Sequence, residues 1–247
     1  MMSGPRIYTP EPLTENTTVA LDDQAVTHLV RVLRMKEGDD LRLFNGDGSE
    51  YQAQLIIESK KSASASVTHV IRQDAPLKLE IHLGQVISKG DRMDFTIQKA
   101  TELGVTDITP LTSERCDVRL KGDRMEKKLE HWQKVAISAC EQSGRNTVPV
   151  IHPPKSLSDW STDTDADRKL LLHPHNQKPL ESEVSSGQSP QSIALLVGPE
   201  GGFSDIEVTQ CQESGFDGLL LGPRILRTET AALTALSVLQ YVWGDFR

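Results

Sequence analysis

Apolar and polar positions follow two different rhythms along the chain, and the change falls near residues 72–78. Before it, short alternating runs predict strands at 7–8, 40–44, 51–59 and 63–71. The dipeptides Asn45-Gly46 and Asp47-Gly48 are typical of a hairpin turn. One helix is predicted within 22–35, capped by Asp22 or Asp23. Residues 1–73 are therefore expected to form a small, barrel-like β domain.

After this boundary, apolar strands alternate with amphipathic helices. Strands are predicted at 79–85, 107–111, 169–173, 193–197 and 218–221, and helices at 92–103, 123–143, 204–214 and 230–243. Apart from the strand at 169–173, residues 156–191 are rich in loop-forming residues, and no element is predicted there. The alternation indicates an α/β domain over 74–247, with a mostly parallel sheet and helices on both faces.

A glycine-rich turn, Gly198-Pro-Glu-Gly-Gly202, separates the apolar run at 193–197 from a helix start. Ser204 and Glu207 have the spacing of a capping box, which opens a helix. Backbone N–H groups and the positive end of the helix dipole make such a turn a ligand site. The letters match neither a P-loop nor the dinucleotide-binding fingerprint. Acidic side chains without a neighbouring Lys or Arg favour a ligand that is neutral or positive there. The alternative is a sharp turn that needs glycine for its backbone alone.

Two more loops should lie at the same edge of the sheet as this turn. They follow the strands at 169–173 and 218–221, and the carboxyl ends of parallel strands meet at one edge. The sequence therefore predicts that three loops enclose one ligand.

Composition favours a cytoplasmic protein. The chain has 247 residues and three cysteines, Cys116, Cys140 and Cys211, with no paired or metal-like spacing. No apolar run approaches the roughly 18 residues of a membrane span, and the first residues lack a signal-peptide core. We expect reduced thiols, no metal site and no membrane association.

Charge is unevenly distributed along the acidic chain. The formal net charge is −8, yet residues 76–145 carry 12 Lys and Arg against 11 Asp and Glu. The basic residues gather most densely between 115 and 128. A solvated helix face explains this run as well as a nucleic-acid contact does.

Five ordered segments resemble the RsmE family of ribosomal RNA uridine methyltransferases. They are QKATELGV at 98–105, SERC at 113–116, EQSGR at 141–145, GPEGGFSDIE at 198–207 and LGPRILRTETAAL at 221–233. HLVRVLR at 28–34 and GDGSEY at 46–51 resemble the family's first domain, so the likeness covers the whole chain. It implies a PUA-like β-barrel RNA-binding domain over 1–73. It also implies a SPOUT-type methyltransferase domain over 74–247, with a parallel sheet and a C-terminal trefoil knot.

The resemblance implies that S-adenosylmethionine binds in the loops of the knot. This cofactor has no phosphate and carries a sulfonium cation, in accord with the acidic turn. The implied cofactor residues are His173, Gly198, Pro199, Glu200, Gly201, Leu221, Gly222, Ile225, Leu226 and Arg227. The implied reaction is methylation of N3 of one uridine in 16S ribosomal RNA near the decoding centre, on the assembled small subunit.

The reaction needs help with one proton, because the uridine N3–H must be lost before the nitrogen attacks. Candidate groups are Glu141, Arg145, Arg227 and Glu229. We expect Arg145 to stabilise the uridine anion. We expect Glu229 to act as the general base or as an orienting group. The alternative for Glu141 and Arg145 is that they cap a helix end and pair across it.

RNA recognition is expected mainly from the first domain. His28, Arg31 and Arg34 recur every three residues and would share one helix face towards phosphates. Further expected phosphate contacts are Arg6, Arg115, Arg119 and Lys121. The family resemblance also implies a homodimer through the second domain. The apolar residues Leu233, Leu236, Leu239 and Val242 of the last helix fit either that interface or an intramolecular core.

Two other functions stay open at this point. One is a noncatalytic RNA-binding or ribosome-assembly factor, which the intact cofactor loops disfavour. The other is a SPOUT methyltransferase with a different target, such as a ribose in transfer RNA. The EQSGR and RILRTETA segments disfavour the second, without excluding a different nucleotide.

Overall fold

The chain divides into two compact units in a computed structural model, which describes residues 4–59, 61–118, 122–173, 178–179 and 189–246. The first unit comprises Met1–Pro76 and Cys140–Val148, and the second comprises Leu77–Ala139 and Pro149–Arg247. The sequence pattern assigns 140–148 to the second domain, whereas in the structure these residues pack with the first.

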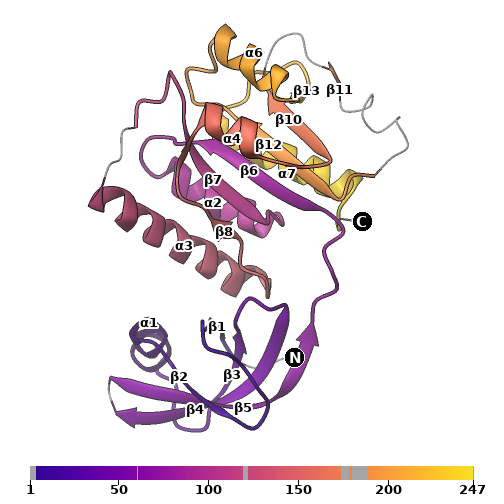
Figure 1. Cartoon of the computed structure of the whole chain (residues 1–247). Coiled ribbons are helices and arrows are strands. Elements are labelled where there is room, and N and C mark those ends of the chain that lie inside the picture. Colours follow the sequence, from indigo (N-terminus) through magenta and orange to yellow (C-terminus); the bar gives the residue numbers. More distant parts are fainter. Residues whose placement is uncertain (1–3, 60, 119–121, 174–177, 180–188, 247) are drawn as a thin grey trace. The chain divides into compact units, whose positions relative to one another are not determined.

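The first unit is built on a five-stranded sheet with the order β1-β3-β4-β5-β2 (Figure 1). Its strands are β1 (Arg6–Tyr8), β2 (Thr18–Ala20), β3 (Asp40–Phe44), β4 (Ser49–Ser59) and β5 (Ser62–Gln73). Strand β1 pairs parallel to β3, and the other pairs are antiparallel. Alternate residues of β3, Leu41 and Leu43, are buried in the core of this unit. Gly46 and Gly48 supply the positive φ angles of the predicted β3–β4 turn. Of these strands, the sequence pattern misses only β2.

The predicted helix within 22–35 is present but is not a regular α-helix. Asp22 caps α1 (Asp23–Val26) by accepting a hydrogen bond from the Ala25 N–H, and the chain continues as a π-helix, η1 (Thr27–Val32). The Leu33 N–H donates to the His28 carbonyl, five residues back. This wider turn breaks the three-residue periodicity on which the predicted basic face rests.

The second unit contains an eight-stranded sheet with the order β11-β13-β10-β12-β6-β7-β8, in which β9 also pairs with β7. The strands are β6 (Glu80–Val86), β7 (Asp107–Thr112), β8 (Val150–Ile151), β9 (Lys155–Ser156), β10 (Arg168–Leu172), β11 (Lys178–Pro179), β12 (Ser192–Val197) and β13 (Asp217–Leu220). All of these pairings are parallel, as the alternation of strands and helices predicts.

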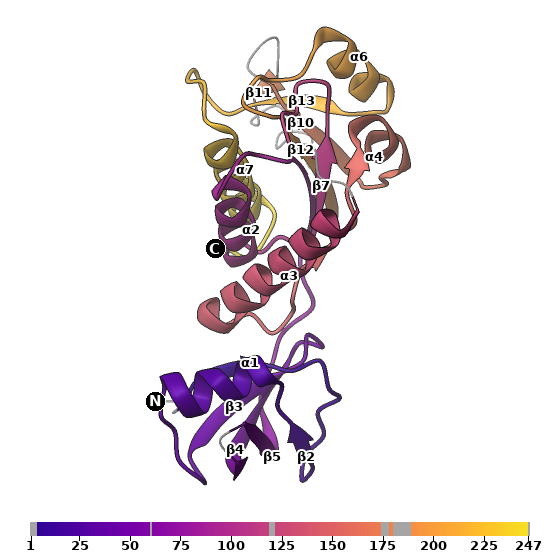
Figure 2. The same ribbon diagram turned by 90° about the vertical axis from the view of Figure 1, so that its left-hand side faces the viewer.

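Helices cover both faces of this sheet (Figure 2). They are α2 (Arg92–Glu102), α3 (Asp123–Ser143), α4 (Leu157–Asp163), α6 (Asp205–Glu213) and α7 (Thr228–Val242). Strand β12 shows why: Ile193 and Leu195 pack into the core formed with α2, α3 and α7, whereas Ala194 and Leu196 pack against α4 and α6. A strand buried on both faces has to be apolar throughout.

The last helix resolves one open alternative. Leu236 and Leu239 are fully buried in the core of the second unit, and Leu233 and Val242 pack partly buried against it. The apolar face of α7 is therefore part of an intramolecular core. Within the described ranges, no helix is long and apolar enough to cross a membrane.

Candidate functional site

Three strands of the second unit end together where the sequence predicts a ligand. In the parallel registers, Leu172 at the end of β10 lies opposite Val197 of β12 and Leu219 of β13. The loops that begin at His173, Gly198 and Leu221 therefore leave the sheet at the same edge.

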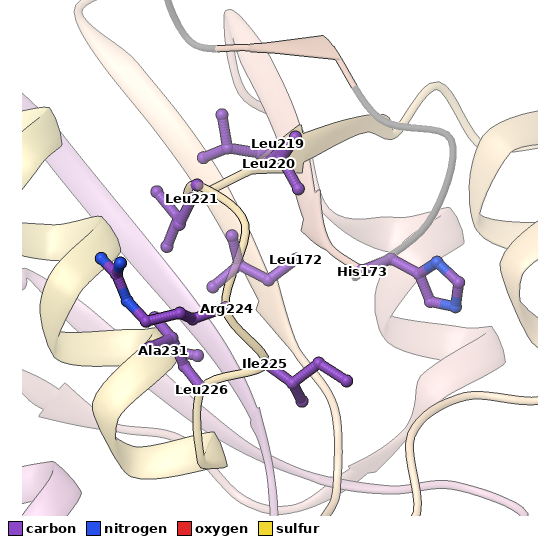
Figure 3. A pocket seen from close by; sticks show the side chains of 10 residues that line it. Leu172, His173, Leu219, Leu220, Leu221, Arg224, Ile225, Leu226 and Ala231 are labelled. Carbon is purple, nitrogen blue, oxygen red and sulfur yellow. The ribbon is translucent and has the colours of Figure 1, made fainter.

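These loops line two adjoining cavities. The larger has a volume of about 500 Å³ and the smaller about 110 Å³. Both are lined by Leu172, His173, Ile225, Leu226 and Ala231. Figure 3 shows the smaller one, where leucines from β10 and β13 gather and the side chains of Arg224 and His173 lie at opposite sides of the view. The site thus combines an apolar floor with polar groups at its margin.

Nine of the ten predicted cofactor residues line one or both cavities. Gly198, Pro199, Glu200 and Arg227 line the larger cavity, and Leu221 and Gly222 line the smaller. His173, Ile225 and Leu226 line both. The tenth, Gly201, is not a lining residue, and its carbonyl accepts a hydrogen bond of 2.9 Å from Arg115.

Gly198 is required by a close approach. A Cβ atom at this position would lie 2.9 Å from Cε2 of Phe203, whose ring is buried. The carbonyl oxygen of Gly198 accepts a 2.6 Å hydrogen bond from the Thr228 hydroxyl, and that hydroxyl accepts one of 3.0 Å from Nε2 of Gln85. The end of β6, the turn after β12 and the first residue of α7 are therefore fixed to one another.

The predicted capping box at the start of α6 is present. The Glu207 carboxylate accepts from the Ser204 N–H at 2.9 Å, and the Ser204 hydroxyl accepts from the Glu207 N–H at 3.3 Å. The other oxygen of Glu207 accepts from the Glu114 N–H at 2.7 Å. Together with the Arg115 hydrogen bond to Gly201, this contact seats the SERC segment against the glycine-rich turn. Arg115 is thus engaged by the turn, although it is exposed.

Arg92, the first residue of α2, is a cavity residue that sequence reasoning misses. Its guanidinium forms a 2.6 Å ion pair with Glu200 at the cavity margin. The sequence contained a signal for it. Helix α2 follows β6, and β6 is the parallel neighbour of β12, so α2 starts at the end of the sheet where the Gly198 turn begins. Thr228 and Leu172 also line the cavity and were not predicted.

The three predicted catalytic residues fall in different units. Glu229 lines the larger cavity, and its Oε2 atom is buried without a hydrogen-bond partner among the described residues. Glu141 and Arg145 belong to the first unit and do not line this cavity. Oε1 of Glu141 accepts from the Tyr8 N–H at 3.0 Å. Burial raises the pKa of Glu141, and this hydrogen bond opposes the shift.

Arg6 is not the surface residue that a phosphate contact requires. It is 8% exposed, and its guanidinium donates to Glu50 and to the segment 140–146 of the same unit. A buried strand position places it there, so the prediction of a phosphate contact is wrong.

The other predicted RNA contacts have different positions. His28, Arg31 and Arg34 are exposed. Arg34 follows η1 with a φ of 55°, a left-handed conformation uncommon for arginine. Arg119 and Lys121 lie outside the described residues.

A third cavity, of about 460 Å³, lies in the second unit near α4. His82 lines it, with Nε2 2.8 Å from the Thr109 hydroxyl and 3.4 Å from the indole nitrogen of Trp160. Burial lowers the pKa of His82 to about 4; His152 and Lys155 act in the same direction, and Asp107 opposes them. Lys155 and Asp163, which also line it, form an ion pair of 2.9 Å, and we assign this cavity no ligand. In the ranges that the structure describes, no cluster of three or more His, Cys, Asp or Glu side chains could hold a metal ion.

Two family models match the chain. One describes an RNA methyltransferase domain and covers residues 75–240, and the other describes an RNA methyltransferase PUA domain and covers residues 21–68.

Similar proteins agree over nearly the full length. Ribosomal RNA small subunit methyltransferase E of Buchnera aphidicola subsp. Acyrthosiphon pisum is 38% identical, over 98% of this chain and 95% of that protein. A putative methyltransferase from Legionella pneumophila, in complex with bound SAM, is 43% identical with a TM-score of 0.94, over 99% of this chain and all of that one. The ribosomal RNA small subunit methyltransferase E from Neisseria gonorrhoeae, bound to S-adenosyl methionine, is 42% identical with a TM-score of 0.90, over 99% of this chain and all of that one.

The parallel sheet with its cavity at the carboxyl edge, the PUA-like first unit and these full-length likenesses agree: the chain belongs to the ribosomal RNA small subunit methyltransferase E family.

Proposed function

We propose that this protein transfers a methyl group from S-adenosylmethionine to N3 of one uridine of 16S ribosomal RNA. The proposed target lies near the decoding centre, and the proposed substrate is the assembled small subunit in the cytoplasm. One observation carries the proposal: nine residues predicted to bind this cofactor, from three separate loops, line adjoining cavities at one edge of the sheet. The two similar structures described with the bound cofactor support it.

The chemistry of the cavity suits the cofactor. The glycine-rich turn brings Glu200 to the cavity margin, but its carboxylate is paired there with Arg92, so the expectation of an acidic turn without a basic neighbour is wrong. The apolar residues around Leu172 offer a surface for the flat adenine ring, and backbone groups of the loops can bond its edge. S-adenosylmethionine supplies a methyl group activated by the sulfonium charge.

The chain's own residues would then handle the proton of N3. Glu229 has a carboxylate oxygen with no partner among the described residues, so it can accept or orient that proton. Arg145 would stabilise the negative charge that spreads over O2 and O4. Glu141 is the third candidate for a catalytic role, to be tested by substitution together with Glu229 and Arg145.

RNA binding is assigned to 1–73 and catalysis to 74–247. The exposed residues His28, Arg31 and Arg34 would contact phosphates, with Arg119 and Lys121 as further candidates. Arg115 is exposed and uses only Nη1 for its hydrogen bonds to the glycine-rich turn, so its other N–H groups would contact a phosphate.

We also propose a trefoil knot and a homodimer. The strand order supports the knot, because the chain leaves β13 at one side of the sheet and returns past the Gly198 turn to pack α7 on α2. The exposed side chains of Phe95 and Tyr241, on these two contacting helices, support an interface between copies of the second unit. Light scattering would measure the mass in solution.

The deciding experiment is transfer of labelled methyl to small subunits that lack the modification. Digestion and mass spectrometry would then identify the labelled nucleoside. Label on N3-methyluridine is the expected result. Label on another nucleoside would keep the fold and the cofactor but discard the proposed target. No label from folded protein that binds the cofactor would favour a noncatalytic RNA-binding role.

A further inference from the structure

The guanidinium of Arg6 has all five of its N–H groups satisfied. Nε donates to Glu50 at 2.6 Å, Nη1 to the carbonyls of Cys140 at 2.5 Å and Glu141 at 3.2 Å, and Nη2 to the Arg145 carbonyl at 3.0 Å and the Asn146 side chain at 2.5 Å. Five donors thus meet five acceptors, which matches the full capacity of the group. Four of the five acceptors lie within 140–146.

These contacts close the C-terminal end of α3. The last carbonyls of a helix lack partners within the helix and carry partial negative charge, so a cation there is stabilising. The guanidinium also lies 4.5 Å from the centre of the Phe44 ring. Lysine would supply the charge but not five N–H groups in one plane. The site is therefore shaped for arginine.

A second group of contacts holds the turn after the helix. Asn146 is fully buried, and its backbone N–H and side-chain amide donate to the two oxygens of Asp74 at 3.3 and 3.2 Å. Arg72 donates to the Gly144 carbonyl and forms a 3.1 Å ion pair with Asp74. The residues on both sides of Arg145 are thus tied to the strands of the first unit.

We propose that Arg6 is a positioning residue for Arg145 in the methylation reaction. It binds the Arg145 carbonyl and the side chain of Asn146, the next residue, so it fixes the backbone from which the Arg145 side chain projects. The unit that is expected to bind RNA would thereby also set the geometry of the anion-stabilising arginine. The inference rests on the proposed function, because it requires that Arg145 act in catalysis.

The test is a double-mutant cycle on Arg6→Lys and Arg145→Ala. If Arg6 acts through Arg145, Arg6→Lys alone lowers kcat by about 10- to 100-fold, because small displacements of a catalytic group have effects of this size. The KM for small subunits and the Kd for S-adenosylmethionine change little. In the Arg145→Ala background, Arg6→Lys lowers kcat no further.

The Glu50 carboxylate has a second arginine partner, and substitution of that arginine is the matched control. Arg42 also pairs with Glu50, at 3.3 Å, and it has no hydrogen bond to 140–148 in the described part of the chain. Arg42→Lys is expected to keep the wild-type kcat. If circular dichroism shows that Arg6→Lys does not fold, Asn146→Ala, which removes the acceptor of Arg6 next to Arg145, replaces it in the same cycle.

Four outcomes are distinguished. Wild-type kcat in folded Arg6→Lys overturns the inference, and so do effects of Arg6→Lys and Arg145→Ala that simply multiply. Label on a nucleoside other than N3-methyluridine rejects the proposed target while the cycle still tests Arg6. No turnover by the wild-type protein rejects the proposed function, and the inference with it.

Discussion

Glu229 holds a buried carboxylate oxygen that has no hydrogen-bond partner among the described residues, at the wall of the larger cavity. Leaving such a group unpaired costs about 1–3 kcal/mol or more when it is charged. In native structures such a group calls for an explanation, and a catalytic role or a bound water or ion are the usual ones. Glu229 is therefore the residue of the cavity wall that most needs a function.

We predict that Glu229→Gln lowers kcat by about 10²- to 10⁴-fold, the range for loss of a general base. The Kd for S-adenosylmethionine, measured by calorimetry, should change by less than about threefold, since the amide keeps the size of the side chain. Thr230→Ala, at the next and exposed position of α7, is the control and should keep wild-type turnover. Full activity of Glu229→Gln would remove Glu229 from the mechanism.

His82 predicts a pH dependence of stability. Its folded pKa of about 4 lies below the ordinary value of 6.5, so between these values the unfolded chain binds a proton that the folded chain does not. Stability contributed by the neutral imidazole is present above pH 6.5 and is lost as the pH falls towards 4. The loss amounts to at most about 3 kcal/mol.

The measurement is urea unfolding at several pH values, followed by tryptophan fluorescence. His82→Gln should show a shallower loss of stability on acidification than the wild-type protein. Gln212→Ala, at an exposed position of the same unit that carries no titratable group, should follow the wild-type curve. Equal slopes for His82→Gln and wild type would contradict the prediction.

At the scale of elements, the glycine-rich turn contains two glycines with different constraints. A Cβ at Gly198 would lie 2.9 Å from the Phe203 ring, whereas at Gly201 it would lie 3.5 Å from Cβ of Arg115, an ordinary contact. We predict that Gly198→Ala destabilises the second unit by about 1–3 kcal/mol through overpacking. Displacement of the turn should also weaken cofactor binding at least about tenfold. Gly201→Ala should match wild type in both measurements. Equal losses for the two variants would contradict the prediction that the close approach to Phe203 causes the effect at Gly198.

The π-helix η1 carries Arg31, one of the exposed basic residues. If Arg31 contacts a phosphate, Arg31→Gln should reduce the slope of log Kd against log salt concentration by about one unit. Filter binding of small subunits over a salt series would measure it. Gln24→Ala, exposed on the neighbouring α1, should leave the slope unchanged. An unchanged slope for Arg31→Gln would place Arg31 outside the RNA contact.

Regular elements were predictable from the sequence where local pattern and tertiary packing agree. Strand β12 and helix α3 carry clear periodicity, and the capping box of α6 is fixed by two residues. Helix α4 was missed because it has seven residues and a polar sequence, LSDWSTD, held by Trp160 in the core. The role of Arg6 was not predictable, since four of its five acceptors lie more than 130 residues away.

At the scale of the molecule, all three tryptophans, Trp132, Trp160 and Trp243, belong to the second unit. Their fluorescence therefore reports the unfolding of the unit that contains the cavities. We predict that S-adenosylmethionine at about 100 times its Kd stabilises this transition by about 2.7 kcal/mol. Gly198→Ala should show a smaller gain at the same concentration. No shift at saturating cofactor would mean that the cavities do not bind it.

Long-range organisation was only partly predictable. The parallel sheet followed from alternating elements, and the meeting of three loops at one edge followed from the rule that loops at carboxyl ends converge. The residues assigned to the cofactor came from the family resemblance instead. Assignment of 140–148 to the first unit did not follow, because the helical pattern of α3 runs from 123 to 143 without a break.

Helix α3 begins in the second unit and ends in the first, which limits how the protein can be divided into fragments. The chain crosses between the units at 76/77, 139/140 and 148/149, so a single cut cannot release the first unit whole. A fragment ending near residue 73 would carry the Arg6 guanidinium but leave four of its five acceptors behind. The remaining piece would expose the end of α3 without its cation. A foreign RNA-binding module fused in place of residues 1–73 would therefore have to supply an equivalent arginine for the acceptors that remain at 140–146.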